Sequence, residues 1–218
     1  MNRLAIFDCD GTLVDSGGSI HRALRTTFDK HGIDCPPRAV TRRVIGLSLD
    51  EAFAELAPDS DHAALSSSYR DAFIAMRGAG MVEEPLYEGI VESLDALLRE
   101  GWVLGVATGK SDRGLAHCLR AHGISDRFVT LQTSDRHPSK PDPSMVLAAM
   151  AEAGSDPGQT VFIGDTAWDI GAARAADCGA IGVLWGYHDE AELVGAGAHH
   201  VACDPAELPA MAARWVEG

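Results

Sequence analysis

The spacing of apolar residues along the chain changes at about residue 85. Beyond that point, short apolar runs that end at turn residues alternate with stretches in which apolar residues recur every three or four positions. Short bounded runs predict buried strands, and the longer period predicts amphipathic helices. We expect strands at 102–107, 128–131, 161–163, 180–184 and 200–202, and helices at 90–100, 112–122, 144–153, 169–176 and 205–216, with a short helix near Glu190.

The residues before this point predict one strand and then only helices. Leu4 to Phe7 is a short apolar run followed by a turn signal, and since an isolated strand is unstable it must join the later strands. Helices are expected at 19–31, at 38–57 with a break at 46–48, and at 59–77. Strands that alternate with helices are typical of a parallel sheet with right-handed crossovers. The sequence therefore predicts an α/β core formed by residues 1–13 and 85–218, with a helical domain inserted at 14–84.

Two carboxylates, Asp8 and Asp10, directly follow the first predicted strand, and Gly11 and Thr12 come next. If the chain stays extended, both carboxylates project to the same side. Two negative charges in this position are unfavourable unless a cation neutralises them or one of them holds a proton. On these residues alone, an ordinary Asp-Gly turn after a strand explains the pattern equally well.

Three later predicted strands are also followed by residues that can bind a ligand or a metal ion. They are Thr108, Gly109 and Lys110 after the second strand, Lys140 in the loop after the third, and Asp165 and Asp169 after the fourth. Ligands of open α/β sheets bind beyond the carboxyl ends of the strands, so these side chains are expected on one rim. Carboxylates, a hydroxyl with free amides and a lysine suit phosphoryl transfer with a hard cation. Oxygen ligands from Asp8, Asp165 and a backbone carbonyl match Mg²⁺.

Composition limits the kinds of molecule that the protein is expected to bind. The chain of 218 residues has a formal net charge of −14 and is 46% hydrophobic, so it can bury a core, while nucleic acid and anionic membranes are poor partners. No apolar stretch is long enough to span a membrane, and no secretory signal is recognisable. The five cysteines are scattered without a CxxC pair, which fits free thiols and a cytoplasmic location.

Four motifs together resemble those of the haloacid dehalogenase superfamily. They are DCDGT, ATGK, SKPDP and GDTAWD, in this order and spread over most of the chain. The stretches IGLSLDEA, GDTAWDI and GYHDEAEL most resemble the phosphoglycolate phosphatase-like branch. The resemblance implies a three-layer Rossmann-like core with a small helical cap domain. The carboxylate at Asp10 favours phosphate esters over haloacids, because a halide leaves without protonation.

The resemblance also implies roles for individual residues. Asp8 would be the nucleophile that becomes phosphorylated, and Asp10 the acid and base that serves the leaving group and then water. Thr108 and the Gly109 amide would hold phosphoryl oxygens, and Lys140 would offset negative charge on the nucleophile and phosphate. Mg²⁺ would be held by the Asp8 carboxylate, the Asp10 carbonyl and Asp165, with Thr12 and Asp169 supporting the ligands and Lys140.

The substrate is harder to predict than the chemistry. Arg43, Gly46 and Ser48 fall where a substrate loop of the cap is expected, but for the arginine a solvated helix face is an equal explanation. Gly109 stands where many relatives carry Asn, which removes a side-chain hydrogen bond but keeps the amide. We expect a small phosphorylated metabolite, with phosphoglycolate as the leading candidate by resemblance.

Two other functions remain open on the sequence. A phosphosugar mutase of the β-phosphoglucomutase type would use the same pair of aspartates, and a catalytically silent binding protein would keep only the scaffold. Intact motifs argue against the silent protein. The oligomeric state stays open between monomer and dimer.

Overall fold

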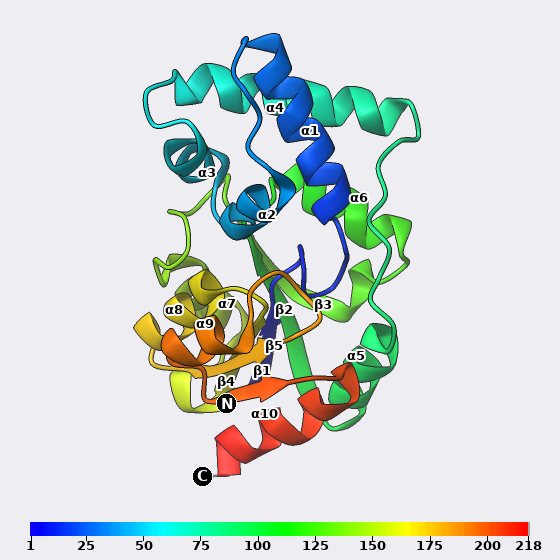
Figure 1. Cartoon of the computed structure of the whole chain (residues 1–218). Helices are drawn as coiled ribbons and strands as arrows, with labels where there is room; N and C mark the ends of the chain where they lie inside the picture. Colours follow the sequence, from blue (N-terminus) through cyan, green and yellow to red (C-terminus); the bar gives the residue numbers. More distant parts are fainter. Residues whose placement is uncertain (218) are drawn as a thin grey trace.

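A central parallel sheet organises the molecule (Figure 1). The computed structural model describes residues 1–217, and in these the sheet has six strands in the order β3-β2-β1-β4-β5-β6. The strands are β1 (Arg3–Phe7), β2 (Trp102–Thr108), β3 (Phe128–Thr133), β4 (Thr160–Gly164), β5 (Gly179–Val183) and β6 (His200–Ala202). The strand order reverses between β1 and β4, which places a topological switch point at the carboxyl end of β1.

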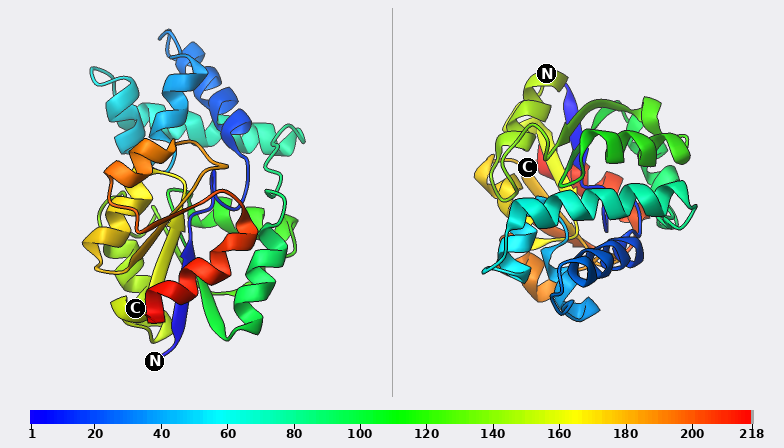
Figure 2. Two further views of the ribbon diagram at one scale, coloured as in Figure 1. Left: turned by 60° about the horizontal axis from the view of Figure 1, so that its bottom comes forward. Right: turned by 90° about the horizontal axis from the view of Figure 1, so that it is seen from above.

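Helices cover both faces of this sheet (Figure 2). Alternate residues of β1 divide between two hydrophobic clusters, with Ala5 and Phe7 in one and Leu4 and Ile6 in the other. The first cluster is completed by α5 (Ile90–Arg99), α6 (Asp112–Ala121) and α10 (Leu208–Glu217), and the second by α7 (Ser144–Ala153), α8 (Ala167–Ala175) and α9 (Glu190–Gly195). Because β1 is buried on both faces from Leu4 to Phe7, these four side chains are all apolar.

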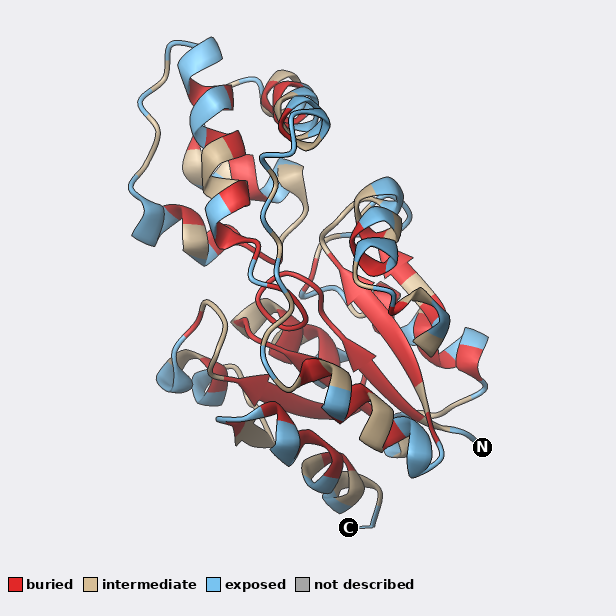
Figure 3. Cartoon of the chain, turned by 90° about the vertical axis from the view of Figure 1, so that its right-hand side faces the viewer, coloured by how far each residue is buried: buried red, intermediate tan, exposed pale blue. Residues whose placement is uncertain are grey.

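A group of helices stands beyond the carboxyl ends of the strands (Figures 1 and 3). It contains α1 (Gly17–Lys30), α2 (Arg38–Thr41), α3 (Leu49–Leu56) and α4 (His62–Gly78). These helices have a hydrophobic cluster of their own, in which the rings of Phe28, Phe53 and Tyr69 meet edge to face. We call residues 17–78 the helical module.

The predicted parallel α/β fold is confirmed, and each predicted strand is present within two residues of its expected bounds. The stretch 38–57 is interrupted at 46–48 as predicted, with α3 after the interruption, but the part before it is α2 followed by a 3₁₀ turn η1 (Arg42–Val44). Gly46 has a φ of +99°, which other residues adopt with difficulty, and Ser48 caps α3 by accepting a hydrogen bond from the amide of Glu51. Further 3₁₀ turns of the same length are η2 (Ser125–Arg127), η3 (Pro157–Gln159) and η4 (Pro205–Glu207).

Within the described residues, no helix combines the length and the apolar character that crossing a lipid bilayer requires.

The aromatic cluster of the helical module should carry much of its stability. Phe53 is fully buried there, so Phe53→Ala is expected to lower the free energy of unfolding by about 3–5 kcal/mol, through lost contacts and the cavity left behind. Urea denaturation measures this loss. Ile74→Ala, at a side chain that is 48% exposed on α4, is the control and should change stability by roughly 0.5 kcal/mol or less. Equal losses for the two variants would contradict the assignment of this core.

Candidate active site

The carboxyl ends of three neighbouring strands form the floor of the site. Asp8 follows β1, Thr108 ends β2 and Asp165 follows β4, and β1 pairs directly with both of the other strands. The fourth polar element is Lys140, which comes from the loop between β3 and α7 and is buried. Residues spread over more than 150 positions of sequence therefore share one rim.

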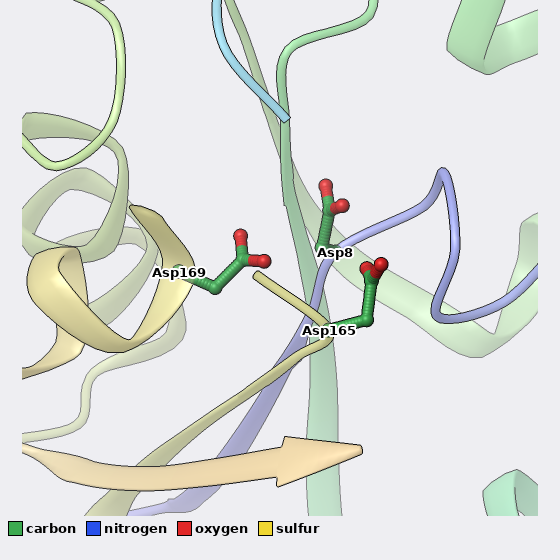
Figure 4. Close-up of side chains that lie close together, drawn as sticks. All are labelled: Asp8, Asp165 and Asp169. Carbon is green, nitrogen blue, oxygen red and sulfur yellow. The ribbon is translucent and has the colours of Figure 1, made fainter. Parts of the chain in front are cut away.

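Three carboxylates meet on this rim (Figure 4). Asp8, Asp165 and Asp169 are buried, and each offers an oxygen that lies within 4.8 Å of the other two. Lys140 Nζ lies 3.0 Å from Asp8 Oδ1 and 2.6 Å from Asp169 Oδ1. Three carboxylates beside one ammonium leave a formal excess of two negative charges, the amount that one divalent cation balances.

Hydrogen bonds and close backbone packing fix the position of the Asp165 carboxylate. Its Oδ1 accepts a hydrogen bond from Thr12 Oγ1 at 2.9 Å, and its Oδ2 accepts one from the Tyr187 amide at 2.9 Å. A Cβ atom at Gly11 or at Gly186 would lie 2.2 Å from an atom of this side chain. Only glycine therefore allows both backbone segments to pack against the Asp165 carboxylate.

Asp169 lies in the first turn of α8 and orients Lys140. Its Oδ2 accepts hydrogen bonds from the amide of Thr166 at 3.0 Å and from its hydroxyl at 2.6 Å, while Thr166 caps the helix in return. Its Oδ1 is the atom that accepts the hydrogen bond from Lys140. Both oxygens of Asp169 already have protein partners, which suits a residue that positions the lysine.

The excess charge raises the pKa of the buried acids. Burial raises the pKa of Asp8 to about 7, against the lowering effect of Lys140 and with the help of Asp169 and Asp10. Burial, followed by the charges of Asp169 and Asp8, raises the pKa of Asp165 well above its usual range. Asp8 Oδ2 is buried and has no hydrogen-bond partner among the described residues. An unpartnered carboxylate oxygen in an oxygen-only donor set fits a hard divalent cation such as Mg²⁺.

Asp10 has a different environment from Asp8. Its Oδ1 lies 2.8 Å from Lys110 Nζ and also accepts a hydrogen bond from the Ser16 hydroxyl. Lys110 Nζ contacts Glu84 Oε1 at 2.6 Å as well, so one ammonium joins two carboxylates. The sequence predicted Lys110 on the rim but gave it no role there. The chain has only three lysines, and this one follows Thr108 and Gly109, which was the signal available.

The helical module reaches the rim at Gly109. A Cβ atom there would lie 2.6 Å from the carbonyl oxygen of Leu47 and 3.0 Å from that of Gly46. The Ser48 amide donates a hydrogen bond to Ser139 Oγ at 2.8 Å, and the Trp168 indole donates one to the Arg43 carbonyl. A side chain at position 109 would therefore collide with the loop at 45–48, which packs directly on this glycine.

The three residues predicted to contact substrate from the helical module lie in different places. Gly46 lines a cavity of about 640 Å³ between the module and the rim. Arg43 forms an ion pair with Glu192 at the surface, with 60% of its side chain exposed. Ser48 caps α3 and bonds to Ser139. Arg43 and Ser48 do not line this cavity, whereas Asp10, Gly109 and Lys110 do.

Comparison with known proteins agrees with this geometry. The family model described as "Haloacid dehalogenase-like hydrolase" matches residues 5–183. The chain is 35% identical to "Probable phosphatase IndB" of Dickeya dadantii over 88% of this chain and 86% of that protein. It is 31% identical to "Phosphoglycolate phosphatase" of Agrobacterium fabrum over 87% and 83%. A solved haloacid dehalogenase-like hydrolase from Streptococcus pneumoniae superposes with a TM-score of 0.84 at 26% identity, over 96% of this chain and 97% of that one.

The raised pKa of Asp8 predicts a pH-dependent response to metal. Without metal the folded chain holds a proton on Asp8 up to about pH 7, whereas the unfolded chain loses it near 3.8, so stability falls as pH rises between these values. A cation that binds the ionised carboxylate reverses this loss. At one hundred times its dissociation constant, Mg²⁺ should add about 2.7 kcal/mol at pH 8, roughly 5–10 °C in Tm, and less at pH 5.5.

Thermal melts with Mg²⁺ or with EDTA at the two pH values measure this difference. Asp8→Asn removes one of the two carboxylates with a raised pKa and one ligand, so it should weaken the pH dependence and reduce the shift caused by Mg²⁺. Equal Mg²⁺ shifts at both pH values in the unaltered chain would contradict the prediction.

Proposed function

The chain belongs to the haloacid dehalogenase-like hydrolase family and is a phosphatase of that family, and we propose that it hydrolyses a small phosphate monoester through a phosphorylated Asp8. One observation carries the proposal: the Asp8 carboxylate lies buried at the switch point of the sheet, against Lys140 and with an unpartnered oxygen. One oxygen of this carboxylate would attack phosphorus, while the other would be available to the cation.

Mg²⁺ fits the donor set described above. The Asp8 carboxylate, the Asp165 carboxylate and the backbone carbonyl of Asp10 would hold it. When bound, the cation would neutralise negative charge on the phosphate and so let two anions approach each other.

In the first step, an Asp8 oxygen forms a bond to phosphorus while the bond from phosphorus to the ester oxygen breaks. Asp10 gives its proton to the departing oxygen, which leaves as an alcohol. In the second step, Asp10 takes a proton from water as that water attacks the phosphorus of the aspartyl-phosphate, and phosphate and Asp8 are released. Lys110 and Ser16 both contact Oδ1 of Asp10, so we assign the proton transfers to Oδ2.

The remaining rim residues stabilise the transferred group. Thr108 and the Gly109 amide would donate hydrogen bonds to phosphoryl oxygens, and Lys140, held by Asp169, would offset their charge. In this proposal residues 14–84 act as a cap that excludes water from the aspartyl-phosphate.

Phosphoglycolate is the first substrate to test, since a relative bears that name. No specific contact favours the phosphosugar mutase over the phosphatase. Assays that follow both phosphate release and isomerisation of a hexose phosphate separate the two.

Asp8→Asn tests the nucleophile. The amide cannot be phosphorylated, so phosphate release with Mg²⁺ present should fall by on the order of 10⁴-fold or more, and no phosphorylated protein should be trapped by rapid acid quench. Asp59→Asn, at an exposed position of the helical module, is the matched control and should keep full activity. Undiminished turnover by Asp8→Asn would exclude the mechanism.

Asp10→Asn tests the proton transfers. Alkyl phosphates need a proton on the departing oxygen, so their turnover should fall by about 10²- to 10⁴-fold. With p-nitrophenyl phosphate, whose leaving group needs no acid, the variant should still release a burst of p-nitrophenol and then stall as phosphorylated protein, because the base for the second step is gone. Equal loss for both ester types and no burst would assign Asp10 a structural role only.

A further inference from the structure

The cavity between the helical module and the rim has the size of a site for a larger molecule than glycolate. Its volume is about 640 Å³, inside the range of roughly 300–1,000 Å³ that is typical of pockets for drug-sized ligands. Asp10 and Gly109 line it from the core, which connects it to the proposed reaction. A two-carbon acid would leave most of this space to water.

Most of the wall that the helical module contributes is apolar, although Arg70 and Arg77 of α4 also line it. The apolar part comes from α1, η1, α3 and α4 and includes Ile20, Leu24, Val44, Leu49, Tyr69 and Phe73. Most of these residues also belong to the hydrophobic cluster of the module or pack against it, so the wall is the inner surface of that core. The hydroxyl groups of a sugar would find few hydrogen-bond partners on the apolar part of this wall, whereas an apolar group would lose only its contact with water.

The cations of the cavity are poorly suited to a short carboxylate. Lys110 is already shared between Asp10 and Glu84, and Arg77 Nη2 lies 3.3 Å from Glu84 Oε2. Arg70 and Arg113 form no ion pair within residues 1–217, but both are exposed residues. The glycolate carboxylate, which lies two bonds from the ester oxygen, would therefore meet Lys110 and Arg77 with their charges already paired, and two arginines that are exposed to solvent.

The helical module already contacts the rim in this structure, so the cavity volume is that of a site with both of its sides in place. The carbonyls of Gly46 and Leu47 pack on Gly109, and Ser48 bonds to Ser139 across the same boundary. Further closure at this boundary would bring backbone atoms into conflict. The apolar volume is therefore available to the alcohol part of a substrate whose phosphate reaches Asp8.

We propose that the alcohol part of the substrate carries an apolar body, an aliphatic chain or a ring, which fills the cavity lined by Leu49, Tyr69 and Phe73. This inference rests on the proposed function, because it takes the phosphate end of the substrate to be the group that Asp8 attacks. The helical module then selects substrates by burial of apolar surface, and phosphoglycolate is a poor substrate.

A series of phosphate monoesters with one reacting group tests the proposal. The probes are phosphoglycolate and the methyl, propyl, butyl, hexyl and 2-phenylethyl phosphates, assayed by phosphate release with Mg²⁺. The value of kcat/KM should rise by roughly three- to fourfold for each methylene that enters the cavity, and phosphoglycolate should fall near the methyl ester. Highest activity on phosphoglycolate, or no dependence on chain length, would overturn the proposal while leaving the phosphatase mechanism intact.

Two variants at opposite ends of α3 test whether the preference for longer esters depends on the residues that line the cavity. Leu49 lines the cavity, whereas Leu56 packs on the same hydrophobic cluster without lining it. Leu49→Ala should lower the ratio of kcat/KM for hexyl over methyl phosphate by about tenfold, and Leu56→Ala should leave the ratio unchanged, with Tm measured for both. Equal ratios in the two variants would remove Leu49, and with it the apolar wall, from substrate selection.

Binding measurements keep the proposal testable if no ester is turned over. Methyl-, butyl- and 2-phenylethylphosphonate lack the cleavable bond, and calorimetry with Mg²⁺ present gives their affinities directly. Affinity that rises with apolar size, without turnover of any ester, would support the cavity assignment and reject the phosphatase mechanism. Equal affinities for the three phosphonates would reject the cavity assignment.

Discussion

Three buried carboxylates with one ammonium to balance them set the main constraint on this molecule. Charges removed from water are stable only when they are paired or neutralised. Lys140 satisfies part of this requirement, and the raised pKa values of Asp8 and Asp165 express the part that remains. The same excess charge that costs stability in the metal-free chain would attract a divalent cation, and through it a phosphate. The buried carboxylates therefore lower the stability of the metal-free chain while they supply the proposed function, a conflict that is common at catalytic centres.

The scaffold fixes these carboxylates by close backbone approach. Gly11 and Gly186 pack on Asp165, and a Cβ at Gly164 would lie 2.3 Å from the Cβ of Asp169. Capping of α8 by Thr166 fixes the direction of Asp169 and hence of Lys140. Groups held in this way need no rearrangement when charge develops on a substrate, which is the main source of electrostatic catalysis.

The core and the helical module contribute different things to the cavity. The acidic group and the lysine come from the segments that follow the strand ends, whereas most of the apolar surface comes from α1, α3 and α4, with Arg70 and Arg77 of α4 beside it. Lys110 connects the two parts, because it contacts Asp10 beside the rim and Glu84 on the segment that returns from the module to the core. The position of that segment and the environment of Asp10 are therefore coupled through one side chain.

The local sequence pattern was enough to predict most of the secondary structure and the parallel sheet. Apolar runs such as Leu4 to Phe7, ended by turn residues, predicted the strands, and their alternation with helices predicted a parallel sheet with polar residues gathered at one edge. The structure brings Asp8, Thr108, Lys140, Asp165 and Asp169 to that edge, while their catalytic roles remain predictions. The motifs were readable because each lies within a few residues of the end of a strand.

Tertiary structure alone decided three features. Lys110 meets Glu84 across 26 residues of sequence, Leu47 lies against Gly109, and Arg43 turns away from the cavity toward Glu192. None of these contacts follows from hydrophobic period or turn chemistry, because each depends on how the helical module lies over the sheet. The amino-acid sequence by itself determined which chemistry is gathered at the rim, and the packing of the module determined what shape and polarity a substrate meets there.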